Sequence, residues 1–356
     1  MLGLLTASAL PRSWALPPKA LRFPRDFGSH PDMQTEWWYV TGHVRAQGRS
    51  YGFQLTFFRS RVASTQNLRS AFAARQLLFA HVALSDIDAG RLLHDQRMAR
   101  AGLGLAEASL EDTDVHIGDW HLRRGAQDGQ PAALASHYDC ALTAREFALR
   151  LRFDTTQPVL LQGTQGLSRK GPEADQASYY YSQPQLSVAG DIMLGGRRLP
   201  VESGRAWLDH ECSDALMHSE AQGWDWTGMN LDDGTALTAF QLRRPDGLAL
   251  WSGGSWRARG GQVQSFAPQQ LQFKPLRHWT SPHSKARYAV DWELATPQGR
   301  FEIRALADDQ ELDSRASTGA IYWEGLSELR RLGPDRSERV GLGYLEMTGY
   351  ANALKL

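Results

Sequence analysis

The densest cluster of ionisable side chains in the sequence is Asp209-His210-Glu211. In an extended strand, side chains two positions apart point to the same face, so Asp209 and Glu211 share one face and His210 takes the other. Two carboxyl groups facing an apolar cavity lose solvation and repel each other's charge, which raises the pKa of one of them. We therefore predict that Asp209 or Glu211 is a catalytic acid able to protonate an alkene. The alternative is structural, with both carboxylates bonded to backbone groups where two barrels join.

The same cluster is poorly spaced for a metal ion. His210 points away from its two neighbours, and the sequence lacks the His-x-x-x-His pair that zinc enzymes carry on a helix. Glycine-rich phosphate loops and the Gly-x-Ser-x-Gly turn of serine hydrolases are absent as well. We predict no metal and no cofactor.

Several tryptophans elsewhere in the sequence could form the walls of a site for an apolar or cationic ligand. We predict that ligand-binding side chains include His210 and four tryptophans, namely Trp37, Trp38, Trp224 and Trp226. Indole faces stabilise a developing positive charge through the ring quadrupole. The alternative is that these tryptophans fill the core, as buried aromatic residues usually do.

A second aromatic and acidic string is Tyr322-Trp323-Glu324. Tyr322 and Glu324 share a face of the expected strand, and we predict that Tyr322 contributes to catalysis while Trp323 and Glu324 bind ligand. A glutamate in an apolar strand must be paired or protonated, so pairing of Glu324 with an arginine is the structural alternative.

The elements that position these residues are predicted to be strands. Apolar and polar residues alternate over 51–57, 147–153 and 288–294, and turn residues such as Asp232-Asp233-Gly234 separate such runs. The best helix candidate is a short one over residues 209–220. The pattern indicates an all-β chain of antiparallel strands, and closing each sheet into a barrel would remove its exposed edges.

An internal repeat suggests how these strands are grouped. Residues 37–55 and 224–242 both open with aromatic residues, reach Thr-Gly, turn at a glycine and end in Phe-Gln-Leu, with a one-residue shift between them. A hairpin alone cannot bury its apolar face, so each copy should open its own sheet. Chance similarity between two hairpins is the alternative. We predict an N-terminal domain over 21–200 and a C-terminal domain over 201–356.

Composition excludes several classes of protein. Lys plus Arg and Asp plus Glu both number 39, so no net charge favours nucleic acid, and no run of about 18 apolar residues predicts a membrane-spanning helix. Residues 1–20 resemble a signal peptide without its basic start, which predicts a periplasmic or secreted protein, with a cytoplasmic one as the alternative. Spacing alone leaves pairing of Cys140 with Cys212 open.

Several motifs together resemble the AttH-like family of exported lipocalin-like proteins, which is related to carotenoid 1,2-hydratases and to lipocalin-like pericyclases. The motifs are FPRDFGSHPD at 23–32, EWWYVTG at 36–42, GFQLTFFR at 52–59, AWLDHE at 206–211, GWDW at 223–226, YWEG at 322–325 and GYLEMTGY at 343–350. The resemblance implies two lipocalin-like β-barrels in tandem, with a ligand site in or between them.

Two functions follow from the resemblance and the residues. The first is acid-catalysed hydration of an apolar, unsaturated small molecule such as an isoprenoid, lipid or polyketide, with Asp209 or Glu211 as the proton donor. The second is a non-catalytic carrier of an apolar ligand, for which the resemblance suggests subunits of an ABC transporter as partners. A carboxyl group kept protonated by burial separates the two, because a carrier has no need of one.

Overall fold

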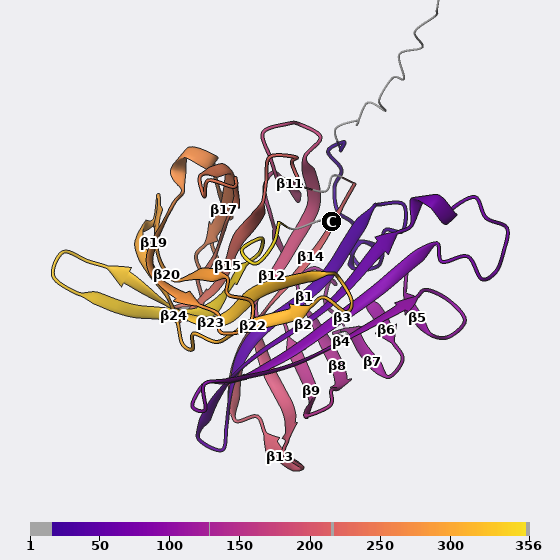
Figure 1. Ribbon diagram of the computed structural model, residues 1–356, viewed down its shortest axis with the longest axis horizontal. Coiled ribbons are helices and arrows are strands. Elements are labelled where there is room, and N and C mark those ends of the chain that lie inside the picture. The colour runs from indigo at the N-terminus through magenta and orange to yellow at the C-terminus, as the bar shows by residue number, and fades with distance from the viewer. Residues whose placement is uncertain (1–15, 128, 215–216, 354–356) are drawn as a thin grey trace, which may run out of the picture.

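The computed structural model describes residues 16–127, 129–214 and 217–353. This part of the chain forms 24 strands and three short 3₁₀ helices, η1 (Arg25–Phe27), η2 (Ala63–Thr65) and η3 (Pro268–Gln270). All strand pairs are antiparallel and fall into two sheets, one after the other along the chain, which confirms the predicted all-β fold (Figure 1). The alternating runs at 51–57, 147–153 and 288–294 all lie in strands, because period two places one apolar row against a core.

The first sheet has 14 strands in the order β4-β3-β2-β1-β14-β12-β9-β8-β7-β6-β5, with β10, β11 and β13 also paired to β12. Arg97 on β4 donates to the carbonyl of Ile117 on β6 at 3.2 Å, which is a contact between the two ends of this nearly closed barrel. Its strands are β1 (Thr35–Ala46), β2 (Arg49–Arg61), β3 (Gln76–Asp86), β4 (Arg91–Arg100), β5 (Ala106–Ala108), β6 (Asp114–Ile117), β7 (Trp120–Ala126), β8 (Ser136–Thr143), β9 (Phe147–Asp154), β10 (Leu160–Leu161), β11 (Leu167–Arg169), β12 (Ala177–Leu194), β13 (Arg197–Pro200) and β14 (Ser203–Ser213).

The second sheet has ten strands in the order β18-β17-β16-β15-β24-β23-β21-β20-β19, with β22 paired to β23. It surrounds a separate apolar core that includes Trp256, Trp292 and Phe301. Its strands are β15 (Gly223–Leu231), β16 (Ala236–Arg243), β17 (Ala249–Arg257), β18 (Gln264–Phe266), β19 (Gln272–Thr280), β20 (Arg287–Thr296), β21 (Gly299–Ala305), β22 (Glu311–Ser314), β23 (Ala320–Leu332) and β24 (Ser337–Met347).

The two segments of the predicted repeat occupy matching places in the two sheets. Each forms the opening hairpin, β1–β2 or β15–β16, and in each sheet the first strand also pairs with the last, β14 or β24. The Phe-Gln-Leu strings differ in register, because Phe53 lies opposite Gly42 whereas Thr238 lies opposite Gly228. The two segments therefore occupy the same position in the topology of their sheets. Close superposition of the two hairpins stays a prediction.

Strand β14 belongs to the first sheet. It pairs with β1 and β12, so the chain passes from one sheet to the other between Ser213 and Gly223. The helix predicted over residues 209–220 is wrong, because residues up to Ser213 alternate between two buried faces as a strand does. The domain division at residue 200 stays a prediction, although the strand that follows it completes the first barrel.

The two sheets pack against each other along a buried aromatic region, here called the seam and defined by Tyr39, Trp207, Trp226, Phe240, Leu326 and Tyr344. Gly52 permits this close approach, since a Cβ at that position would lie 2.6 Å from the Tyr344 hydroxyl and 3.0 Å from Leu326 Cβ. The outer faces of β1, β2 and β14 therefore become interior where the second sheet covers them.

Three remaining expectations concern the termini and the cysteines. The signal-like segment lies largely outside the described residues, and export stays a prediction. No helix in the described part of the chain has the length and apolar character needed to cross a membrane. Cys140 and Cys212 are both buried and both free, so the disulfide left open by the sequence does not form here.

Candidate functional site

Strand β14 presents two chemically different faces. Trp207 belongs to the seam, whereas Leu208 belongs to the core of the first barrel. Asp209 and Glu211 lie on the Trp207 face, and His210 lies on the Leu208 face, where it stacks on Trp38. The alternation predicted from the sequence therefore holds, and only the carboxyl groups face the second sheet.

Asp209 is buried among hydrogen-bond donors that carry no charge. Ser182 and Trp207 donate to Oδ1 at 2.5 and 2.7 Å, and the Tyr180 hydroxyl donates to Oδ2 at 2.7 Å. Burial raises the pKa of Asp209 from its ordinary 3.8 to about 7, against the opposing effect of these three hydrogen bonds and with a further contribution from Glu211. This carboxyl group can exchange a proton near neutral pH.

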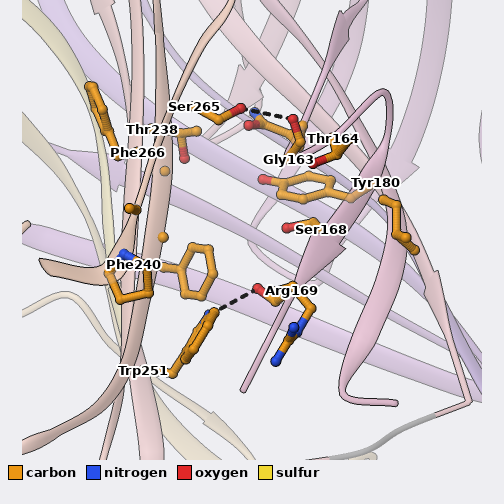
Figure 2. Close-up of a pocket in the computed structure, with 16 residues that line it drawn as sticks. Gly163, Thr164, Ser168, Arg169, Tyr180, Thr238, Phe240, Trp251, Ser265 and Phe266 are labelled. Atoms are coloured by element: carbon orange, nitrogen blue, oxygen red, sulfur yellow. Dashed lines mark hydrogen bonds between the residues drawn. The ribbon is translucent and has the colours of Figure 1, made fainter. Parts of the chain in front are cut away.

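A cleft of about 270 Å³ lies between the sheets, close to Asp209. One wall comes from the segment around β10–β12 and the other from β16–β18 (Figure 2). Its larger side chains are Arg169, Tyr180, Phe240, Trp251 and Phe266. Tyr180 joins the cleft to the acid, because its ring forms part of the wall while its hydroxyl is bonded to Asp209. The Trp226 indole N–H approaches the same hydroxyl at 3.4 Å.

Glu211 has a different environment from Asp209. Its Oε1 lies 3.0 Å from the Lys170 ammonium group, which also sits over the rings of Tyr180 and Phe240 at 4.3 and 4.6 Å from their centroids. The ion pair satisfies Glu211 as a carboxylate. The structure therefore separates the two predicted acids, with Asp209 the one that burial keeps near protonation.

A second pair of acids lies farther along the seam. Glu324 on β23 and Glu346 on β24 are directly opposite each other. Burial raises the pKa of Glu346 to about 7 and that of Glu324 well above its usual range, where the charge of Glu346 adds to the effect. Neither carboxyl group has an ion pair among the described residues, unlike the arginine pairing considered for Glu324. The pair therefore retains at least one proton at neutral pH.

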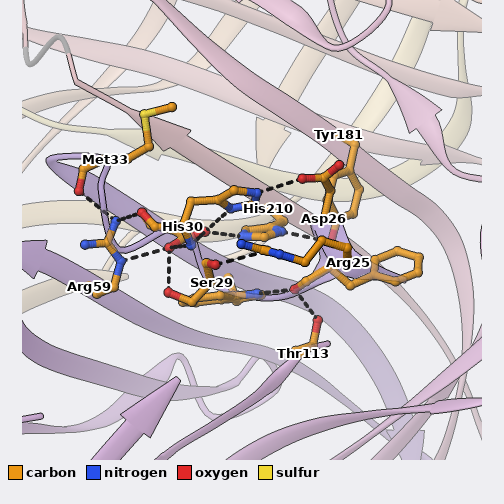
Figure 3. A network of polar contacts seen from close by, with 12 residues as sticks. Arg25, Asp26, Ser29, His30, Met33, Arg59, Thr113, Tyr181 and His210 are labelled. Carbon is orange, nitrogen blue, oxygen red and sulfur yellow. Dashed lines mark hydrogen bonds and ion pairs between the residues drawn. The ribbon is translucent and has the colours of Figure 1, made fainter. Parts of the chain in front are cut away.

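The opposite face of β14 borders a network of ionic groups inside the first barrel (Figure 3). Glu36 is fully buried and accepts hydrogen bonds from Arg59 Nε at 2.8 Å, His30 Nδ1 at 2.7 Å and His210 Nε2 at 2.9 Å. His30 Nε2 in turn lies 2.9 Å from Asp26. Burial alone would raise the pKa of Glu36, but hydrogen bonds from His210 and His30 hold it well below its usual range.

His30, Glu36 and His210 bring three potential ligand atoms within 4.8 Å of one another. Two imidazoles and a carboxylate are a donor set that Zn²⁺ or Fe²⁺ accepts. Each of these ligand atoms already takes part in a hydrogen bond within the protein. Burial alone would lower the pKa of His30, but hydrogen bonds to Asp26, Cys212 and Glu36 raise it to about 11. Arg59 and His30 are cationic and contact the anionic Glu36 and Asp26, so the charges in the network are paired. We assign the network to stabilisation of the first barrel.

The remaining predicted site residues are divided among three regions. Trp37 and Trp224 pack half-buried against the seam. Trp38 and Trp323 lie in the cores of the first and second barrels, where their indoles donate to the carbonyls of Phe27 and Asp308. Core packing is thus their structural role, and neither lines the cleft.

Tyr322 lies away from the cleft and from Asp209. Its hydroxyl lies 2.9 Å from His81 Nδ1 on β3, and it packs with Ala83 and Leu312. This contact joins the two sheets. Its predicted catalytic role has no support from this position.

Sequence reasoning missed the residues that form the cleft. Tyr180 sits in the run Tyr179-Tyr180-Tyr181, whose central member alone faces the acid. Phe240 is part of the Phe-Gln-Leu repeat, whereas Trp251 lies in β17, whose sequence shows no apolar alternation. Nothing in the linear pattern indicates that these segments meet, because they belong to different sheets.

Comparisons with known proteins agree with this architecture. A model of the AttH-like family matches residues 14–350. A crystal structure of a protein assigned as AttH from Nitrosomonas europaea is 44% identical, with a TM-score of 0.85, and the match covers 94% of this chain and 99% of that one. No curated protein matches the chain.

Two more distant structures share the fold. Kievitone hydratase from Nectria haematococca is 14% identical with a TM-score of 0.68, over 89% of each chain. CghA with Sch210972 is 14% identical with a TM-score of 0.57, over 89% of this chain and 88% of that one.

Proposed function

The chain belongs to the AttH-like family, and from that premise and the site geometry we propose that it is a hydratase-like enzyme. It adds water to an apolar, unsaturated small molecule held in the cleft between the two sheets. The name of kievitone hydratase, which has the same fold, supports this reaction class.

One observation carries the proposal: a buried carboxyl group is hydrogen-bonded to a hydroxyl whose ring lines the cleft. Asp209 has no direct route to the cleft, since only 3% of its surface is exposed, but Tyr180 contacts both. A neutral carboxyl–phenol pair in an apolar wall is a proton source that adds no net charge to the site.

In the proposed step, Asp209 is protonated on Oδ2 and donates to the Tyr180 oxygen, which reverses the hydrogen bond seen in the structure. The Tyr180 hydroxyl then gives its proton to an alkene carbon while the Asp209 carboxyl returns one to Tyr180. The alkene π electrons form the new C–H bond and leave a carbocation, and Asp209 becomes a carboxylate. A water molecule then attacks the cation, and the proton it releases restores Asp209 through Tyr180. Phe240 and Trp251 line the cleft, and the ring faces that Lys170 and Arg169 leave uncovered can stabilise the positive charge.

The test compares two variants that preserve shape. Purified protein is incubated with prenyl alkenes such as geraniol and geranic acid, and products heavier by one water are measured by mass spectrometry. We expect Asp209→Asn and Tyr180→Phe each to reduce turnover by roughly 10²–10⁴-fold, the usual contribution of a general acid, with ligand affinity nearly unchanged. Asp139→Asn, an exposed carboxylate on β8, is the matched control. Full turnover in both site variants would refute this mechanism.

A non-catalytic carrier is the second candidate function. A cleft of about 340 Å³ between the β16–β17 turn and β19–β20 favours it, because Phe273, Trp292 and Tyr350 give that cleft an aromatic lining. A carrier would bind prenyl ligands without converting them, and ABC transporter subunits stay a proposal for its partners. Binding without turnover across the whole substrate panel would favour this second function.

A further inference from the structure

The cleft contains a cation that lacks an acidic partner. Arg169 lines the cleft and makes no ion pair with any residue that the structure describes. Its Nη2 donates to the carbonyls of Gly171 and Pro172 at 3.0 and 2.5 Å, while its Nε is buried without an acceptor. A buried donor without a partner is costly, and a guanidinium group is suited to carboxylate and similar oxygens.

Arg169 is held in place from both its backbone and its side chain. The Trp251 indole donates to the Arg169 carbonyl at 3.2 Å, and the guanidinium carbon lies 5.0 Å from the centroid of the same indole ring. Figure 2 shows the Arg169 side chain beside Trp251, with Tyr180 farther along the same cleft. The cation is therefore fixed at one part of the cleft and the proton source at another.

The neighbouring basic residue, Lys170, differs from Arg169 in having an acidic partner. Lys170 is already paired with Glu211 at 3.0 Å, so its charge is compensated within the protein. Arg169 has only neutral carbonyl partners. A ligand that enters the cleft therefore meets one uncompensated positive charge, next to an apolar aromatic surface formed by Trp251 and Phe240.

We propose that Arg169 binds an acidic oxygen of the substrate, so that the cleft selects amphipathic unsaturated acids over neutral analogues. The acidic oxygen is that of a carboxylate, a phenolate or an enolate, all of which accept hydrogen bonds from a guanidinium group. The apolar body of the ligand then lies against Phe240 and Trp251, toward Tyr180. This inference rests on the proposed function, whose substrate class it narrows.

The test uses two probes that differ in one charge. Geranic acid, ionised at neutral pH, and its methyl ester are titrated into the full-length protein by calorimetry. We expect the acid to bind at least about tenfold more tightly than the ester, as a charge-assisted hydrogen bond provides. Arg169→Gln should remove this preference by weakening the acid alone. Arg150→Gln, an exposed arginine on β9, is the matched control and should retain the preference.

Two further measurements keep the result interpretable. Added salt should weaken binding of the acid but not of the ester to the unaltered protein, which requires no variant. Arg169→Lys should retain part of the preference, because it keeps the charge and loses the planar donor pair. Equal affinity of the unaltered protein for acid and ester would overturn this inference while leaving the proposed function standing. Failure of both probes to bind would count against an apolar ligand cleft and thus against the proposed function as well.

Discussion

Adjacent residues on β14 belong to two buried polar regions, one of which contains cationic groups while the other contains only uncharged hydrogen-bond donors. His210 faces the Glu36 network of the first barrel, where Arg59 and His30 supply positive charge to a fully buried carboxylate. Asp209 faces the seam, where only neutral hydroxyl and indole donors reach it. The pKa of Glu36 is lowered and that of Asp209 is raised, although both side chains are buried.

The comparison shows that burial does not decide the state of a carboxyl group by itself. Hydrogen bonds from His210 and from the cationic His30 offset the lost hydration of Glu36, whereas three hydrogen bonds from uncharged donors only partly offset that of Asp209. A carboxylate with fixed cations is a structural element. A carboxyl group with neutral donors keeps its proton within reach of neutral pH, which is the property an acid catalyst requires.

The largest effect on the stability of the protein is expected from neutralising Glu36 in the ionic network of the first barrel. Glu36→Gln leaves Arg59 and His30 buried without their central anion, and breaking a buried ion pair from one side costs about 3–5 kcal/mol. We expect a large fall in melting temperature, measured by circular dichroism or calorimetry. Glu107→Gln, an exposed glutamate on β5, should leave the melting temperature unchanged. A stable Glu36→Gln protein would show that the network does not hold the first barrel.

A moderate effect is expected from the seam, where packing rather than ion pairing joins the sheets. Gly52→Ala places a methyl group 2.6 Å from the Tyr344 hydroxyl and 3.0 Å from Leu326 Cβ, and such overpacking costs about 1–3 kcal/mol. Thermal unfolding should detect this loss. Adding Tyr344→Phe removes the closest clashing atom and should recover part of the stability. No recovery in the double variant would mean that the strain arises elsewhere.

The smallest effect on stability, and the most specific, concerns pH. The pKa of Asp209 is raised on folding from 3.8 to about 7, so its contribution to stability is fully present below about 4 and is lost as the pH rises through about 7. This contribution to the melting temperature should therefore fall between about pH 4 and pH 7, with Glu346 contributing in the same direction, whereas buried histidines of lowered pKa such as His43 and His81 contribute in the opposite direction. Asp209→Asn should flatten part of this fall, while Asp139→Asn should not. An identical pH profile in Asp209→Asn would contradict the raised pKa.

The elements of this fold were predictable because strand alternation is a local property. Residues 51–57, 147–153 and 288–294 show one apolar row each, and all three runs are strands. The same rule placed Asp209 and Glu211 together and His210 opposite. The helix expected over residues 209–220 is wrong. The alternation rule also did not show that β14 completes the first sheet.

The partners of these side chains were not predictable from spacing. Glu36 meets Arg59 across 23 residues and His210 across 174, and Asp209 meets Tyr180 across 29. Local pattern carries no information on such distances, since strand order in a barrel is set by long-range pairing. The predicted absence of a metal site rested on the spacing of residues 209–211 and on the missing His-x-x-x-His pair, and it did not take His30 and Glu36 beside His210 into account.

The sequence by itself determined that the chain is all-β, which residues alternate, and that Asp209 and Glu211 share a face. These follow from side-chain period and turn residues, which act over a few positions. Only the tertiary structure decided that Asp209 lacks a cation, that Glu211 has one in Lys170, and that Tyr180 and Arg169 border one cleft. The physical reason is that a pKa and a binding site depend on which groups surround a side chain in space, and packing the second sheet against the first brings those groups together.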